Sequence, residues 1–194
     1  MLRARIIGTV CLVLAAIASA PASASAPAGD EELLTIRWVG DQVTRIGSLN
    51  TASEKRPPTI ARAIEAFGRP SSTKRTSRVS CTLMWSKLGL HATFVSLGSA
   101  YPTTATCVAR LGVLQTATVQ KRRIQTQGGL RAGDSVDRLK ELHPEAYFQD
   151  GCFWLATAPA VLGSEQRSQR TWIVRALAYG GVVRRIGLRI GAAQ

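Results

Sequence analysis

The chain has 194 residues, of which 45% are hydrophobic, and its 25 lysines and arginines outnumber 12 acidic residues to give a formal net charge of +13. This length predicts one domain that can bury a core without help from a metal. Beyond the first 26 residues no apolar run is long enough to cross a bilayer, so we expect no transmembrane segment in the mature protein.

Residues 1–26 have the features of a secretory signal peptide. A charged start precedes an apolar run over residues 6–18, which is short for a membrane span, and small-residue cleavage sites follow it. Cleavage is expected after Ala24 or Ala26, which would lower the net charge to +11 and leave residues 27–33 as a disordered leader. The protein is therefore expected to be secreted or associated with the cell envelope.

Residues 34–191 are expected to form a single globular domain that begins with strands and one helix. Hydrophobic periodicity predicts a hairpin over 34–49, a helix over 59–67, and strands over 79–85, 90–94 and 107–119. The helix is expected to end at Gly68, because glycine followed by Pro70 is a common stop signal. Loops are expected over 71–78, which is polar and basic, and over 98–106.

A second helix is predicted after the glycines at 128 and 129. Asp134 is expected to cap it, Val136, Leu139 and Leu142 recur at helical spacing, and Pro144 ends it. The remaining chain predicts a short strand over 152–156, a mobile loop over 158–170, and a hairpin of 172–179 with 182–190. Gly180-Gly181 favours a tight turn in that hairpin, because glycine readily adopts positive φ angles.

Two internal similarities suggest two related halves. Residues 40–47 and 180–187 share the pattern Gly-x-x-Val-x-Arg-Ile-Gly, and each predicted helix is followed by strands that carry a cysteine and a tryptophan. The two similarities differ in register, because the shared hairpin precedes the first helix but follows the second. Chance recurrence of common hairpin chemistry is the alternative explanation.

The predicted fold class is α+β. We expect a mostly antiparallel sheet with two short helices packed on one face, in two loosely similar halves of about 34–126 and 127–191.

Three cysteines would remain after signal cleavage, and in a secreted chain two of them should pair. Cys81 and Cys107 are the expected pair, because both lie in predicted strands of the first half that a single hairpin excursion joins. Cys152, beside Phe153 and Trp154, is then expected to be a buried thiol. The alternative pairings join Cys152 to one of the other two cysteines.

The sequence offers no convincing catalytic, cofactor or metal site. Gly133-Asp134-Ser135-Val136 is similar to the Gly-Asp-Ser-Leu motif of a lipase and esterase family, but its position is wrong and no Asp-x-x-His follows. Ser135 is therefore expected to belong to the helix start. His91 and His143 are expected to be structural or at the surface, and two histidines alone make a poor metal site. No phosphate loop or dinucleotide fingerprint is present.

The strong positive charge suggests attraction to an anionic polymer, such as a cell-envelope polymer, rather than specific nucleic-acid binding. Solubility is the plainer explanation of the same charge. Possible polyanion contacts lie in three local clusters: Lys74, Arg75 and Arg78; Lys121, Arg122 and Arg123; Arg184 and Arg185.

Four stretches of the chain are similar to known proteins: Ala66-Phe67-Gly68-Arg69-Pro70-Ser71, Cys81-x-x-x-Trp85-x-x-x-Gly89-Leu90, Gly129-Leu130-x-x-Gly133-Asp134-Ser135, and Trp154-Leu155. Over residues 40–191 they resemble uncharacterised secreted proteins of high-GC Gram-positive bacteria, a resemblance that implies no known activity. The helix-start stretches also resemble the helix-plus-antiparallel-sheet modules of β-lactamase inhibitor proteins and of small outer-membrane assembly lipoproteins. No inhibitory loop or catalytic residue can be carried over.

We therefore expect a secreted, non-enzymatic domain that binds an anionic envelope polymer or another protein. A cell-wall-associated hydrolase and a secreted protein inhibitor are the alternatives. The sequence does not indicate an oligomeric state.

Overall fold

The computed structural model describes residues 33–40, 42–53, 55–96, 106–109, 112–159 and 170–190. The predicted signal peptide, almost all of the leader, and most of the predicted loops over 98–106 and 158–170 lie outside these residues. The described chain is mostly antiparallel β-structure with helices, which agrees with the predicted α+β class. It forms two sheets, however, and not the single sheet that the sequence predicted.

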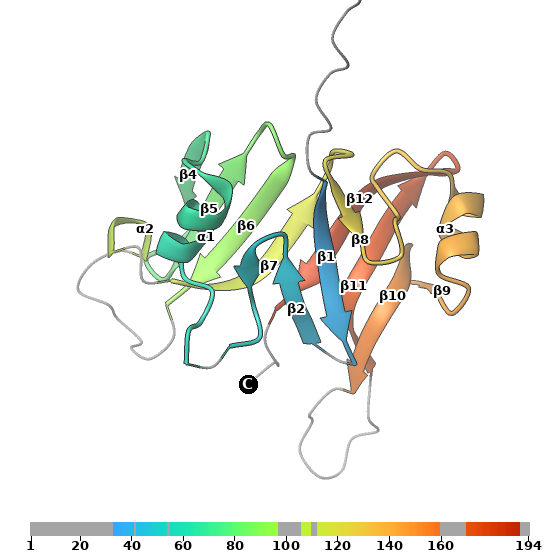
Figure 1. Ribbon diagram of the computed structural model, residues 1–194, viewed down its shortest axis with the longest axis horizontal. Helices are drawn as coiled ribbons and strands as arrows, with labels where there is room; N and C mark the ends of the chain where they lie inside the picture. The colour runs from blue at the N-terminus through green and yellow to red at the C-terminus, as the bar shows by residue number, and fades with distance from the viewer. Residues whose placement is uncertain are drawn as a thin grey trace, which may run out of the picture. The chain divides into compact units, whose positions relative to one another are not determined.

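The larger sheet has eight strands, and all its neighbours pair antiparallel. Across the sheet the strands are β4 (Ser72–Arg75), β5 (Ser80–Trp85), β6 (Leu90–Val95), β7 (Val113–Val119), β12 (Val182–Arg189), β11 (Arg170–Tyr179), β10 (Cys152–Pro159) and β9 (Tyr147–Gln149). The order is symmetric about the central pair of β7 and β12. Each arm is a meander that runs inward from one edge, β4 to β7 on one side and β9 to β12 on the other (Figure 1).

The smaller sheet has four strands in the order β3 (Leu49–Asn50), β2 (Gln42–Ile46), β1 (Leu34–Val39) and β8 (Ile124–Thr126). Its β1–β8 pair is parallel. Strand β8 belongs to the segment that follows β7 and not to the first hairpin. Strand β8 was not expected from the sequence. It attaches the first hairpin to the middle of the chain.

The core lies between the smaller sheet and one face of the larger one. Alternating burial in β5 and β6 places Leu83, Trp85, Leu90 and Phe94 on that face, and each is at most 3% exposed. Buried side chains of the smaller sheet belong to the same cluster: Ile36, Val43, Ile46, Leu49 and Ile124. In Figure 1 the smaller sheet accordingly lies over the central strands of the larger one.

The first predicted helix is confirmed as α1 (Ile60–Phe67). The Thr59 hydroxyl caps it by accepting the backbone N–H of Arg62, and Gly68 ends it with a φ of 76°. The helix is attached to β5 through Trp85, whose indole N–H donates to the Gly68 carbonyl at 2.8 Å. The Phe67 and Trp85 rings also meet edge to face, 5.4 Å apart.

The second predicted helix is confirmed as α3 (Val136–Leu142), but its predicted cap is wrong. Ser135, not Asp134, accepts the N–H of Arg138 and caps the helix. The Asp134 carboxylate instead accepts the backbone N–H of Arg131 at 2.8 Å and forms an ion pair with Arg122. Serine and aspartate are both good helix-capping residues, so the local sequence allows either one to cap α3. The Asp134 carboxylate is engaged by Arg131 and Arg122, which leaves Ser135 as the cap.

The strand predicted over 107–119 is wrong in its first part. Residues Thr106–Ala109 form a short helix, α2, and the strand β7 begins only at Val113. Gly112 lies at this break, packed so closely that an added Cβ would be 2.4 Å from Thr106 Cγ2 and 3.0 Å from Phe94 Cβ. The basic stretch 71–78 is also not only a loop, since residues Ser72–Arg75 add an exposed edge strand. Edge strands with lysine or arginine resist unwanted pairing with other chains.

The two hairpins that share a sequence pattern also share their geometry. The pairs Trp38–Val43 and Ala178–Val183 flank turns in which Gly40 and Gly180 have φ angles of 54° and 61°. Each hairpin has one register shift immediately beyond that pair. The two hairpins nevertheless lie in different sheets.

Candidate functional site

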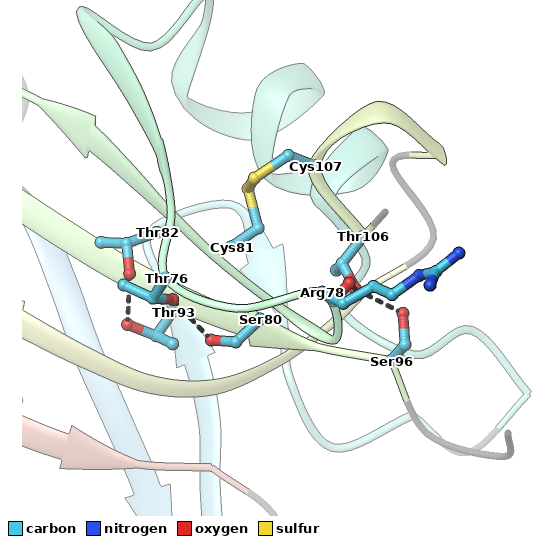
Figure 2. The surroundings of a disulfide bond; sticks show 9 residues. All are labelled: Thr76, Arg78, Ser80, Cys81, Thr82, Thr93, Ser96, Thr106 and Cys107. Atoms are coloured by element: carbon cyan, nitrogen blue, oxygen red, sulfur yellow. Dashed lines mark hydrogen bonds between the residues drawn. A yellow bond between two sulfur atoms is a disulfide. The ribbon is translucent and has the colours of Figure 1, made fainter. Parts of the chain in front are cut away.

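The predicted disulfide is confirmed: Cys81 and Cys107 are bonded, with their Cα atoms 5.2 Å apart. Figure 2 shows that the bond links strand β5 to the short helix α2. Thr106, beside Cys107, strengthens the same attachment, because its backbone N–H donates to the Arg78 carbonyl and its hydroxyl lies 2.6 Å from that of Ser96. The disulfide thus holds α2 against the sheet and has a structural role.

Arg78, whose polyanion contact stays a prediction, lies near the disulfide, and its backbone carbonyl accepts from Thr106 (Figure 2). Cys152 is a free thiol and is 5% exposed, as expected from its apolar neighbours.

The best candidate site is a hollow of about 480 Å³ beside the central strands β7 and β12. Four cationic side chains line it: Lys121, Arg122, Arg123 and Arg184. Gln120, Ala132, Gly133 and Val183 complete the lining. We call this hollow the cationic pocket. It combines the whole of one predicted cluster with Arg184 from another, although 61 residues separate Arg123 from Arg184 in the sequence.

Backbone hydrogen bonds hold the two sides of the cationic pocket together. The N–H of Gly133 donates to the Val183 carbonyl at 2.7 Å, and the N–H of Val183 donates to the Asp134 carbonyl at 2.8 Å. The segment before α3 therefore runs beside the start of β12, so Arg184 is brought to the segment that follows β7. The position of the cations is set by the backbone and not only by flexible side chains.

Two of the cations are fixed further by local contacts. Lys121 lies so close to Gly89, whose φ is +65°, that a Cβ on Gly89 would be 2.6 Å from Lys121 Cγ and 2.8 Å from its backbone nitrogen. The Arg184 Nε–H donates to the Tyr179 carbonyl at 3.3 Å. Such contacts reduce the side-chain freedom that would be lost when an anion binds.

Arg122 has the best-defined contact. Its Nη2 atom lies 2.8 Å from Asp134 Oδ1, and the Arg122 side chain is 59% exposed whereas that of Asp134 is 12% exposed. Sequence reasoning placed Asp134 in the helix cap and missed its place beside the cationic pocket. No sequence signal links residues 122 and 134, because only the paired backbone brings them together.

The other predicted polyanion contacts lie elsewhere. Lys74 and Arg75 are exposed on β4, at one edge of the larger sheet and away from its central strands. Arg185 is exposed on β12 but does not line the cationic pocket. The three predicted clusters therefore do not form one continuous site.

His143, at the end of α3, is buried in a hydrogen-bonded group. Its Nε2 lies 3.0 Å from the Thr126 hydroxyl and its Nδ1 lies 3.3 Å from the Glu145 carboxylate, while its ring stacks on Trp38. Thr126 is fully buried and also accepts the backbone N–H of Leu130. These contacts tie the end of α3 to β1 and β8, so the group is structural.

The second face of the larger sheet carries no described helix or strand. Its half-buried side chains alternate with the core residues: Thr82, Met84, His91, Thr93, Thr116, Thr118, Arg175 and Arg189. The hydroxyls of Thr82 and Thr93 lie 3.0 Å apart across two strands (Figure 2). Trp154 belongs to the same face and is buried against Tyr147, and among the described residues its Nε1 has no hydrogen-bond partner.

Within the described ranges, no group of three histidine, cysteine or acidic side chains could hold a metal ion. The same residues include no helix long and apolar enough to cross a membrane.

Comparison of the chain with family models, with curated proteins and with solved structures finds no match.

Proposed function

We propose that the protein is a secreted, non-enzymatic domain that binds a phosphate-bearing polymer of the cell envelope through its cationic pocket. The main support for this proposal is that four cationic side chains line one hollow: Lys121, Arg122, Arg123 and Arg184. The residues that line it include no acid. Guanidinium groups match phosphate oxygens in geometry and charge, and a lysine adds a compact point charge.

The size of the pocket suits one repeat unit of such a polymer. A volume of about 480 Å³ lies within the usual range of roughly 300–1,000 Å³ for small-molecule sites. Because the cations are surface groups, each contact is expected to be weak and salt-sensitive, and affinity would come from several contacts along a polymer. The net charge of the mature chain, which is +11 once the two arginines of the signal peptide are subtracted from +13, would speed the encounter with any polyanion.

The proposal predicts a specific loss of polyanion binding when the pocket is neutralised. The triple variant Lys121→Gln, Arg122→Gln and Arg184→Gln should bind long-chain inorganic polyphosphate at least about 30-fold more weakly than the wild type. The slope of log affinity against log salt should fall by about 2, since roughly 0.7 counterions are released per phosphate contacted on a flexible strand. Fluorescence anisotropy over a salt series measures both quantities.

The matched control removes the same charge elsewhere. Arg69→Gln, Lys74→Gln and Arg75→Gln also removes three positive charges from exposed positions, but these residues do not line the pocket. This variant should lose no more than about threefold, through long-range attraction alone. Equal losses in the two triple variants would show that only net charge matters, and the pocket would then have no role.

A protein partner is the second candidate, and the second face of the larger sheet favours it. In the described part of the chain that face presents half-buried threonine, methionine and arginine side chains. Methionine, arginine and aromatic residues are enriched in protein interfaces. The pocket variant separates the two candidates, because it should weaken a polyanion but spare a protein held on this face.

Secretion is part of the proposal, and the charged, apolar and small-residue regions of the first 26 residues support it. The mature N-terminus should lie between Pro21 and Ala28. N-terminal sequencing of protein from the culture medium tests this. Recovery of the chain with Met1 intact would contradict it.

We also propose that the domain consists of two loosely similar halves with both main helices on the core side of the larger sheet. The order of elements supports this, because α1 is followed by β4 to β7 and α3 by β9 to β12. The buried residues Ala63 of α1 and Leu139 of α3 belong to one core cluster, which supports a common side.

A further inference from the structure

Asp134 is an acidic group that reaches Arg122 of the cationic pocket. Two hydrogen bonds hold the residue in place. Its carboxylate oxygen Oδ2 accepts the Arg131 N–H at 2.8 Å, and its backbone carbonyl accepts the Val183 N–H. With only 12% of its side chain exposed, Asp134 is a fixed part of the fold. Arg122, at 59% exposed, is the partner that can move.

The Arg122 guanidinium is partly occupied in this arrangement. Its Nη2 atom bonds Asp134 Oδ1 at 2.8 Å. Its Nη1 atom lies against Gly133, where an added Cβ would be only 3.2 Å away. Both bidentate edges of the guanidinium include the Nη2 atom, so a phosphate that binds Arg122 through two parallel N–H groups competes there with the Asp134 carboxylate.

We infer that Asp134 is the resident counter-ion of the cationic pocket, which a phosphate group of the ligand displaces from Arg122. This inference rests on the proposed function and adds to it how the affinity is set. The carboxylate competes for Arg122 and repels the incoming anion, so it keeps binding to the polymer weak and reversible. It also offsets the mutual repulsion of the neighbouring cations when no ligand is bound.

The test is the variant Asp134→Asn, measured with long-chain inorganic polyphosphate over a salt series. An asparagine oxygen can still accept the Arg131 N–H, so the local fold should persist, which an unchanged melting temperature verifies. The variant should bind polyphosphate about fivefold more tightly, the effect of removing one unit charge a few ångströms from a bound phosphate at high effective dielectric. The salt slope should stay close to that of the wild type, because Arg122 contacts one phosphate in both proteins.

Glu141→Gln is the matched control. Glu141 is also ion-paired to an arginine, Arg138, at 2.9 Å, and both side chains are more than half exposed on α3. This variant changes the net charge equally and frees an arginine outside the pocket, so its affinity should change by less than about twofold. A similar gain in both variants would overturn the inference, because net charge alone would explain it.

Arg122→Gln in the Asp134→Asn background should remove the gain, since Arg122 carries it. Persistence of the gain, or weaker binding by Asp134→Asn itself, would overturn the inference and make Asp134 either irrelevant or a positioning residue for Arg122. These outcomes leave the proposed function intact if the wild type still binds in a pocket-dependent way. Failure of both wild type and Asp134→Asn to bind at low salt would defeat the proposed function together with the inference.

Discussion

Replacement of both Cys81 and Cys107 by serine should lower the free energy of unfolding by about 3.5 kcal/mol. The bond closes a loop across a sequence separation of 26 residues, and the chain-entropy relation gives this value for such a loop. Domains of this size are typically stable by about 5–15 kcal/mol, so the loss is a large part of the total. Urea unfolding followed by tryptophan fluorescence measures it.

Cys152 provides the control for this prediction. It is buried but not bonded, so Cys152→Ala should preserve the effect of the disulfide, and a reductant should still lower the stability of that variant. A reductant should have no such effect on the double serine variant. Titration of denatured, unreduced mature protein should find the single thiol of Cys152. Three reactive thiols in that titration would show that the bond does not form.

Phe94→Ala should be the most destabilising single substitution in the core, at about 4 kcal/mol. Phe94 is fully buried near the end of β6, pairs across the sheet with Cys81 and Leu114, and lies against Gly112. Truncation of a buried phenylalanine removes apolar contacts and leaves a cavity that rigid neighbours cannot fill. Urea unfolding again measures the change.

His91, three residues earlier on the same strand, provides a control for burial. It faces the second side of the sheet and is only half-buried, so His91→Ala should change the free energy of unfolding by less than about 1 kcal/mol. Equal effects of the two substitutions would mean that the second face is as well packed as the first. That result would remove the support for the protein-partner candidate.

Local sequence patterns predicted most of the individual elements. The helix over 59–67 and the hairpin around Gly180 were predictable, because capping residues, glycine turns and apolar periodicity act within a few residues of one another. The Cys81–Cys107 bond was also predictable once two cysteines had been placed in neighbouring elements. Alternation along β5 and β6 identified Phe94 as a core residue for the same reason.

Elements with weak local patterns were not predictable. Strand β8 has only three residues and exists because β1 offers it a partner, and β4 is a polar segment that becomes a strand only beside β5. The helix α2 lies where a strand was predicted, and the disulfide and the close packing of Gly112 against Thr106 are long-range contacts that the local pattern does not contain. Local propensity is too weak to oppose such contacts.

The sequence by itself determined the compositional features of the candidate site: an excess of arginine and lysine, and the cluster at Lys121, Arg122 and Arg123. Only the tertiary structure decided which clusters meet. The pairing of Gly133 with Val183 brings Arg184 to the first cluster, and it turns Asp134 from a predicted cap into the partner of Arg122. The physical reason is that charge and capping preference are properties of single residues, whereas a pocket depends on backbone pairing between segments far apart in the chain.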